Sequence, residues 1–463
     1  MNTTLLKPGL VQTINSFLRK PAYIMLLALM AALSFALGAE LLAYSVLALV
    51  VGYTCIHSED LLPLLPILAY AYVIPSTANN PGQSEDSIFS GAAGIYVAFI
   101  GALIGASLVY RLVRDRKRLF RAKGMLTESL IILTFAYALS GIGFRGYLDV
   151  AWKNIPYGII QGVSLLLPYW LVIGSVDWEK TRKDYFAWIG FGMGCLLSFE
   201  IICIYISQDV INNGAIDRTL IYAGWGMYNN IGNLLAMMIP FAFWLGVHYK
   251  KLVVGYIFGI VFLGFVFLTC SRSSMIFSTL CFCTCWLIAP DREHRKYALI
   301  AFAVAAFAGL VVLGIFFDKI YDMFAHILDD VHELGSRIDI YWQGLNEFAK
   351  NPIFGRSFYP AAGLSYNWAS TDIISLMPPR WHNTVIQLMA STGLVGVIAY
   401  GYYRYQTIRL ALRCKTRQQI LMVISAMVLI LGALTDTHMF NVGPCMFYAM
   451  IMAWVEKKEL NWQ

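Results

Sequence analysis

The chain has 463 residues, of which 59% are hydrophobic and only 13% are charged, and its mean hydropathy is +0.64. This composition is typical of a polytopic membrane protein and excludes a soluble globular domain. The net charge of +7 requires no nucleic-acid partner, because cytoplasmic loops that face anionic lipid account for an excess of Lys and Arg.

Apolar stretches occur along the whole chain, and about fourteen of them are candidates to cross a hydrocarbon core of roughly 30 Å. They start near Ala22, Glu40, Leu61, Ile88, Met125, Pro156, Tyr185, Ile231, Leu252, Ser273, Tyr297, Asn383, Ile420 and Phe440. The first stretch follows basic residues and has no small-residue cleavage site, so we expect a retained signal anchor. The predicted fold is all-α, a single polytopic transmembrane bundle of about 12–14 helices over residues 1–463.

Most of the 34 Lys and Arg residues fall on one side of this arrangement when the N-terminus is placed in the cytoplasm. The largest basic groups are Arg111 to Lys123 and Arg404 to Arg417. The positive-inside rule therefore predicts that both termini are cytoplasmic. Residues 318–382 then form a large extracytoplasmic loop. Loops of this length commonly carry structure of their own, and the helical spacing of apolar residues predicts a short helix around Ser336 to Ala349.

A few basic residues remain outside, against the orientation rule, and most of them are arginines. They are Arg145, Lys153, Arg218, Arg272, Lys319, Arg337, Lys350, Arg356 and Arg380. Guanidinium suits phosphate because its planar fork donates two parallel hydrogen bonds and stays charged. The alternative is that these arginines snorkel to lipid headgroups or pair with acidic loop residues.

His382 lies where the polar loop ends and the apolar pattern resumes. A helix turns about 100° per residue, so Gly393 and Gly396, eleven and fourteen residues later, are expected on one helix face with His382. Glycines there let a neighbouring helix approach closely, which would hold the imidazole in a crevice. Asn383 is suited to cap the helix. For His382 alone, a hydrogen-bonded structural role is the alternative.

Asp436 and His438, at the outer end of a late helix, are candidates to complete such a site. Glu200 lies inside a predicted span, where a carboxyl group suggests either function or a structural hydrogen bond. Cys281, Cys283 and Cys285 alternate at a spacing that spreads them around a helix, so no metal site is expected there.

The motif His382-Asn383, nine residues, then Gly393-Leu394-Val395-Gly396 resembles the signature of the O-antigen ligase and Wzy-like polymerase superfamily of integral-membrane glycosyltransferases. Three further motifs resemble that family in its order. They are Arg218 before the Asn-rich stretch Tyr228 to Ala236, Ser271-Arg272-Ser273, and Arg337 and Trp342 followed by Asn351-Pro352-Ile353-Phe354-Gly355. The family's usual Asn-Pro-Asn is degraded in the first of these. The resemblance covers about the C-terminal half of the chain.

The resemblance implies a GT-C-like enzyme that moves a glycan from a polyprenyl (undecaprenyl) diphosphate carrier to an acceptor hydroxyl, at the outer face of the cytoplasmic membrane. Such a reaction needs a base for the hydroxyl and a cationic cradle for the diphosphate. His382 is the expected base; Arg218 and Arg272 are the expected diphosphate ligands. Arg337, Asn383, Gly393, Gly396 and Asp436 are expected to support the site. No metal or cofactor is expected.

The acceptor is a glycan or glycolipid, and the intact His-Asn signature favours a ligase acting on a lipid A core. A polymerase of the same superfamily is the first alternative. A lipid-linked oligosaccharide transporter is the alternative from another class, but such a chain should show paired halves and polar residues through the midplane. Neither is visible in the sequence.

Overall fold

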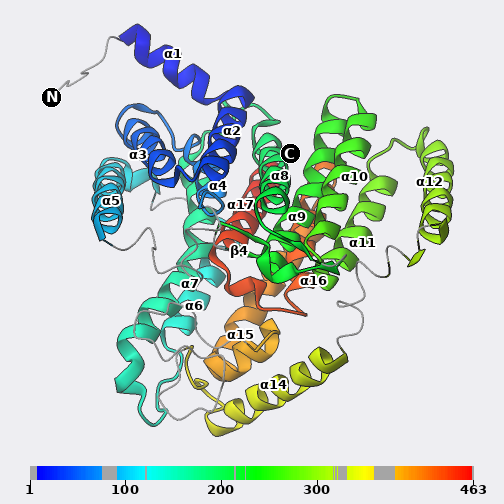
Figure 1. Ribbon diagram of the computed structural model, residues 1–463. Coiled ribbons are helices and arrows are strands. Elements are labelled where there is room, and N and C mark those ends of the chain that lie inside the picture. Colours follow the sequence, from blue (N-terminus) through cyan, green and yellow to red (C-terminus); the bar gives the residue numbers. More distant parts are fainter. Residues whose placement is uncertain are drawn as a thin grey trace. The chain divides into compact units, whose positions relative to one another are not determined.

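The computed structural model describes residues 8–75, 91–119, 123–212, 215–224, 226–315, 317–318, 321, 331–358 and 381–460. Helices dominate the described chain, which confirms the all-α fold class (Figure 1). The chain divides into two compact units. Unit 1 is Met1–Ala122, Leu171–Ile327 and Thr416–Val428; unit 2 is Lys123–Trp170, Leu328–Lys415 and Leu429–Gln463. That residues 1–463 form a single domain stays a prediction.

Unit 1 contains the helices of the N-terminal part and the middle of the chain, with two small antiparallel hairpins. Its elements are α1 (Pro8–Leu18), α2 (Pro21–Leu37), α3 (Glu40–His57), α4 (Leu64–Tyr70), α5 (Gly91–Leu119), α8 (Tyr185–Ser207), β1 (Ile211–Asn212), β2 (Ala215–Ile216), η2 (Arg218–Leu220), β3 (Tyr222–Ala223), β4 (Gly226–Met227), α9 (Tyr228–His248), α10 (Leu252–Leu268), α11 (Arg272–Ile288) and α12 (Arg295–Ile315).

Unit 2 is built around a long helix late in the chain. Its elements are α6 (Thr127–Ala138), α14 (Val331–Lys350), α15 (Thr384–Leu412), η3 (His438–Phe440) and α17 (Val442–Leu460). Two further helices, α7 (Tyr147–Ser175) and α16 (Arg417–Gly432), contribute residues to both units. Within unit 2, α15 packs against α6, α14 and α17.

Six helices among the described residues are long and apolar enough to cross a membrane, and the bent pair α1 and α2 makes a seventh candidate. The six are α3, α5, α7, α8, α9 and α15; α6, α10, α11 and α16 are apolar but shorter. The chain is therefore a multi-pass membrane protein. Each of the fourteen expected segments contains a helix, but the stretch near Leu61 is too short to span: α4 has only 7 residues, about 10 Å at the rise of an α-helix. Pro63 precedes this short helix and Pro66 lies inside it.

The core of unit 1 is α9, which is buried along almost its whole length. It packs against α8, α10 and α11, which are drawn in neighbouring shades of green in Figure 1. Small residues permit the closest of these contacts: a Cβ added to Gly246 of α9 would lie 3.2 Å from the backbone nitrogen of Gly255 in α10. Close backbone approach of this kind is typical of helix pairs in membranes.

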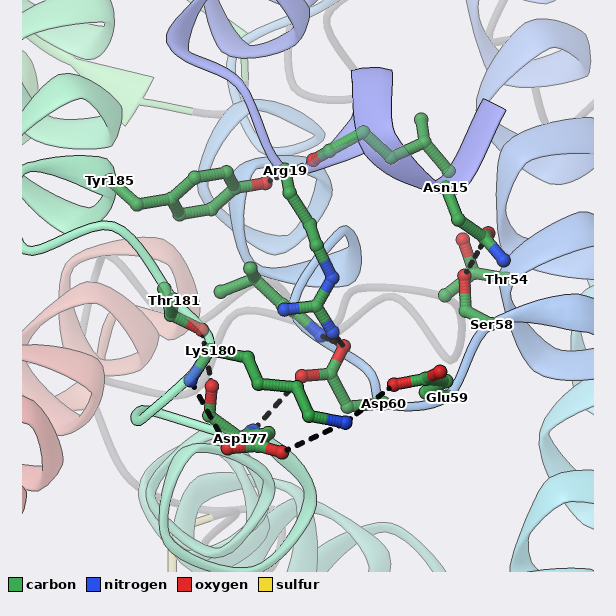
Figure 2. Close-up of polar contacts among 12 residues, drawn as sticks. Asn15, Arg19, Thr54, Ser58, Glu59, Asp60, Asp177, Lys180, Thr181 and Tyr185 are labelled. Carbon is green, nitrogen blue, oxygen red and sulfur yellow. Dashed lines mark hydrogen bonds and ion pairs between the residues drawn. The ribbon is translucent and has the colours of Figure 1, made fainter. Parts of the chain in front are cut away.

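A polar network joins three connections of unit 1, namely α1 to α2, α3 to α4 and α7 to α8 (Figure 2). Arg19 forms an ion pair of 2.7 Å with Asp60, whose side chain is 1% exposed. Asp60 also accepts a hydrogen bond of 2.9 Å from the backbone N–H of Asp177. Nearby, Lys180 pairs with Glu59 at 3.1 Å, but both of these side chains are largely exposed. The basic residues here include Arg19 and Lys180, both predicted to face the cytoplasm.

Replacing Asp60 with alanine is expected to destabilise the protein, because Arg19 would lose its carboxylate partner in a covered position. Breaking one side of a buried ion pair costs about 3–5 kcal/mol. The thermal midpoint of the detergent-solubilised protein should fall by several degrees. The exposed Glu59→Ala variant is the matched control and should leave the midpoint nearly unchanged, since exposed ion pairs contribute little. Equal midpoints for the two variants would show that the ion pair between Arg19 and Asp60 does not stabilise the protein.

Candidate functional site

His382 lies directly before the cap residue of α15. Asn383 is the cap residue, and its side-chain oxygen accepts hydrogen bonds from the backbone N–H groups of Val385 and Ile386 at 2.8 and 3.1 Å. The predicted capping role is thus confirmed. His382 itself has a φ of 48°, in the left-handed region. This conformation is uncommon for a residue other than glycine and turns the chain sharply into the helix.

His382 faces the segment between α16 and η3. Its Nδ1 lies 3.4 Å from Oδ1 of Asp436, and its side chain is 32% exposed, whereas that of Asp436 is 11% exposed. Burial by itself would raise the pKa of Asp436. The hydrogen-bonding and charge contributions of His382, the charge of His438 and the backbone N–H of Thr437 outweigh burial and hold this pKa below its usual range. The pair therefore consists of an ionised carboxylate beside a partly exposed imidazole.

The segment between α16 and η3, which carries Asp436, is hydrogen-bonded to the start of α15. Asn383 Nδ2 donates to the carbonyl of Leu434 at 2.7 Å, and the N–H of Thr384 donates to the carbonyl of Ala433 at 3.0 Å. These bonds fix the distance between His382 and Asp436, which are far apart in the sequence. Asn383 therefore has two roles, one as a cap and one as a link between the two segments.

Arg337 belongs to α14, which confirms the helix predicted within the large loop. Its Nη1 donates to the carbonyl of Thr435 at 3.2 Å, next to Asp436 in the chain. From the same helix, the hydroxyl of Tyr341 donates to the carbonyl of His382 at 3.2 Å. The helix thus supports both segments of the site. Tyr341 and Thr435 belong to none of the sequence motifs, because their contacts depend on distant parts of the chain.

α15 is broken at Gly393, where φ is 60° and ψ is −159°. The prediction that His382, Gly393 and Gly396 share one face of a straight helix is therefore wrong. A Cβ added to Gly396 would meet the Thr392 side chain of the same helix. The close approach expected at these glycines does occur at Gly393, but the partner is a loop segment rather than a helix.

That partner is the segment from Pro352 to Gly355, which packs against the break in α15. The N–H of Leu394 donates to the carbonyl of Pro352 at 2.8 Å, and the N–H of Val395 donates to the carbonyl of Ile353 at 3.1 Å. These loop carbonyls take the place of helix carbonyls at the break. The bonds satisfy backbone groups that would be costly to leave unpaired in the interior.

In this contact the backbones of Gly355 and Gly393 lie directly against each other. Both have positive φ, and a Cβ on Gly393 would lie 2.5 Å from the nitrogen of Gly355, while one on Gly355 would lie 2.4 Å from the carbonyl carbon of Ser391. The N–H groups of Arg356 and Ser357 continue the pairing by donating to the carbonyls of Ala390 and Ser391 at 2.7 and 3.0 Å. Glycine is required at both positions for steric reasons.

Arg218 and Arg272 lie in unit 1. Arg218 begins η2, whose cap residue is Asp217, and its guanidinium lies 5.1 Å from the ring centroid of Tyr228. Arg272 is the first residue of α11, directly after the cap residue Ser271 and two positions after Cys270. Burial raises the pKa of the Cys270 thiol to about 12, while the charge of Arg218 acts in the opposite direction. Arg218 is thus within electrostatic reach of the turn that carries Arg272.

Two other basic residues predicted outside, Arg356 and Lys350, form ion pairs. Arg356 pairs with Glu347 and lies 4.4 Å from the ring centroid of Phe144, and Lys350 pairs with Glu347 at 2.7 Å. For Arg356 the alternative of pairing with acidic residues therefore holds. Lys319 and Arg380 lie outside the described residues.

Glu200 is fully buried in α8, and neither of its carboxyl oxygens has a hydrogen-bond partner within the described part of the chain. No cluster of three or more metal-ligating side chains occurs among the residues that the structure describes. The predicted site residues His382, Arg337, Asn383, Gly393, Gly396 and Asp436 thus belong to unit 2, and Arg218 and Arg272 belong to unit 1.

Comparison with known protein families finds a match in the second half of the chain. Residues 257–401 match the family model described as O-antigen ligase. The matched region includes Arg272, Arg337 and the stretch from His382 to Gly396, but neither Arg218 nor Asp436. No curated protein matches the chain. The family match confirms the resemblance to the O-antigen ligase superfamily that the motifs indicate.

Proposed function

Since this chain carries the O-antigen ligase family match over residues 257–401, we propose that it is a glycosyltransferase that moves a glycan from a polyprenyl diphosphate carrier to an acceptor hydroxyl. The observation that carries the proposal is the pairing of Asp436 with His382, which lies at the capped start of α15 and inside a motif of that superfamily. A lipid A core is the proposed acceptor. The proposed location is the inner membrane, with both termini cytoplasmic and the site on the outer face.

In the proposed reaction, His382 accepts the proton of the acceptor hydroxyl through Nε2, because Nδ1 faces Asp436. The hydroxyl oxygen forms a bond to the anomeric carbon of the donor glycan while the bond from that carbon to the diphosphate oxygen breaks. The ionised Asp436 orients the ring and stabilises the imidazolium that forms, a role that carboxylates fill in other acid–base pairs. It acts as a positioning residue.

Arg218 and Arg272 are proposed to bind the donor diphosphate and to stabilise the negative charge that the leaving group gains. Fixed cationic donors aimed at a developing charge are commonly the largest electrostatic contribution to catalysis. Guanidinium groups fulfil this role without a divalent ion, so the proposed reaction is independent of added metal.

The function is tested by incubating the purified protein in liposomes with a polyprenyl diphosphate-linked glycan and either a lipid A core or a second donor molecule as acceptor. Transfer to the lipid A core supports the ligase proposal. Chain extension on the second donor instead would make the protein a polymerase of the same superfamily. Donor that crosses the bilayer without transfer would contradict the enzyme proposal and favour a transporter.

Replacing Arg272 with lysine is expected to raise the KM for the donor by about tenfold, because the charge is kept while the two-pronged hydrogen bonding of guanidinium is lost. The exposed Arg292→Lys variant, in the connection between α11 and α12, is the matched control and should keep the wild-type KM. Initial rates at varied donor concentration measure both. An unchanged KM in the Arg272 variant argues against its role as a diphosphate ligand.

A further inference from the structure

Arg404 lies inside the candidate span α15, although its charge grouped it with basic residues of the cytoplasmic side. Its guanidinium is enclosed by tyrosines of α15 and α17. Nη1 donates to the hydroxyl of Tyr448 at 2.7 Å, and the guanidinium carbon lies 4.6 Å from the ring centroid of Tyr400 and 5.3 Å from those of Tyr403 and Tyr448. We call these four residues the tyrosine cage.

The charge in the tyrosine cage has no anionic partner among the described residues. No carboxylate of the described chain forms an ion pair with Arg404, and its Nε and Nη2 are covered atoms without a hydrogen-bond partner there. A guanidinium does not lose its proton in proteins, so it cannot become neutral as a buried carboxyl or amine would. Charged groups inside membrane spans are costly and mark functional sites by default.

The unused donors have a specific geometry. Nη1 is occupied by Tyr448, which leaves Nε and Nη2, the two groups that form one edge of the guanidinium plane. Two parallel N–H donors on one edge match two oxygens of a phosphate group. Lipid phosphates are abundant anions of a bilayer, and they lie where membrane helices leave the hydrocarbon core.

We propose that the tyrosine cage binds the phosphate group of a membrane lipid, with Nε and Nη2 of Arg404 as its donors. The residue as a whole is partly exposed, as is Tyr400, whose ring centroid lies 4.6 Å from the guanidinium carbon, so the ligand is proposed to approach on this side of the cage. The source is either a bilayer phospholipid or the diphosphate of a polyprenyl carrier. The proposal does not depend on the transferase function.

The cage lies deeper in unit 2 than the His382 and Asp436 pair, along α17. Asp436 and η3 precede that helix, and Tyr448 is its seventh residue, six residues or roughly 9 Å along the axis from Val442. If the ligand is a polyprenyl diphosphate, the cage is therefore a resting or entry site on the same unit rather than the place of bond cleavage.

The test compares lipid binding by the full-length wild type and by Arg404→Gln in detergent, measured by native mass spectrometry and by microscale thermophoresis. The probes are phosphatidylglycerol and undecaprenyl diphosphate without a glycan. We expect the Arg404 variant to bind one of the two lipids at least about tenfold more weakly than the wild type, a loss of roughly 1.4 kcal/mol. Preference for phosphatidylglycerol identifies a bilayer lipid; preference for undecaprenyl diphosphate identifies the carrier.

The matched control is Arg409→Gln on the same helix. Arg409 is exposed and also lies against a tyrosine, with its guanidinium 5.6 Å from the ring centroid of Tyr405, and its replacement should leave both affinities unchanged. Should Arg404→Gln fail to fold, Arg404→Lys keeps the charge and removes the two-donor edge, and it should show the same loss. Equal affinities of the wild type and the folded Arg404 variant for both lipids would overturn the proposal, whether or not glycan transfer is found.

Discussion

Replacing His382 with alanine is expected to reduce glycan transfer by about 10²- to 10⁴-fold, the usual contribution of a general base. The melting temperature of the solubilised protein should change little, because the imidazole is partly exposed and its described polar contact is the one with Asp436. Initial rates with saturating donor and acceptor measure the effect on kcat. Transfer at a near-normal rate would show that His382 is not the base, even if the family assignment holds.

The backbone of His382 makes a second variant informative. With φ at 48°, the position suits asparagine, which tolerates the left-handed region better than most residues. His382→Asn should therefore fold at least as well as the alanine variant and remain inactive, since an amide does not accept a proton at neutral pH. Alanine replacement of the exposed His294 is the matched control and should keep full activity.

The role of Asp436 is separated from a structural one by kinetics. Asp436→Asn keeps the size of the side chain but removes the charge beside His382, so kcat should fall while the KM values for donor and acceptor stay close to wild type. A rise in KM with unchanged kcat would instead indicate that the segment from Leu434 to His438 shapes the binding of a substrate. The variant is informative because Asp436 is buried and ionised in the folded protein.

The sequence alone supports the parts of this site that depend on neighbouring residues. Asn383 was predictable as a cap because capping is set by a few positions along the chain. The helix that carries Arg337 was predictable from its spacing of apolar residues. Composition and apolar stretches predicted a multi-pass chain, and the six apolar spans confirm that class.

The contacts that build the site are long-range, and the sequence does not reveal them directly. The distance of 3.4 Å between His382 and Asp436 depends on hydrogen bonds from Asn383 and Thr384 to the segment that follows α16. Helical periodicity assumes a straight helix, so it failed at Gly393. Arg404 was grouped with the basic residues of the cytoplasmic side, because the sequence does not show that three tyrosines enclose it.

The break in α15 leads to the second large expected effect: Gly393→Ala should impair both folding and transfer. A backbone with φ 60° and ψ −159° is unstrained only for glycine. For another residue the strain costs about 1–3 kcal/mol. The added Cβ would also lie 2.5 Å from backbone atoms of Ile353 and Gly355, and overpacking adds roughly 1–3 kcal/mol. Backbone atoms cannot rotate away, so the loop from Pro352 to Gly355 must separate from the helix. Because that loop follows the helix that carries Arg337, the separation should disturb the site as well.

A comparison within the same helix isolates this cause. Gly401 also lies in α15, but an added Cβ there meets nothing within 4 Å, so Gly401→Ala should keep the wild-type melting temperature and activity. Gly355→Ala removes the same contact from its other side and should reproduce the Gly393 effect. Because both replacements break one contact, the double variant should lose clearly less stability than the sum of the single losses. Additive losses, or a Gly393→Ala protein as stable and active as Gly401→Ala, would mean that the docking of the loop onto the helix break does not hold the site together.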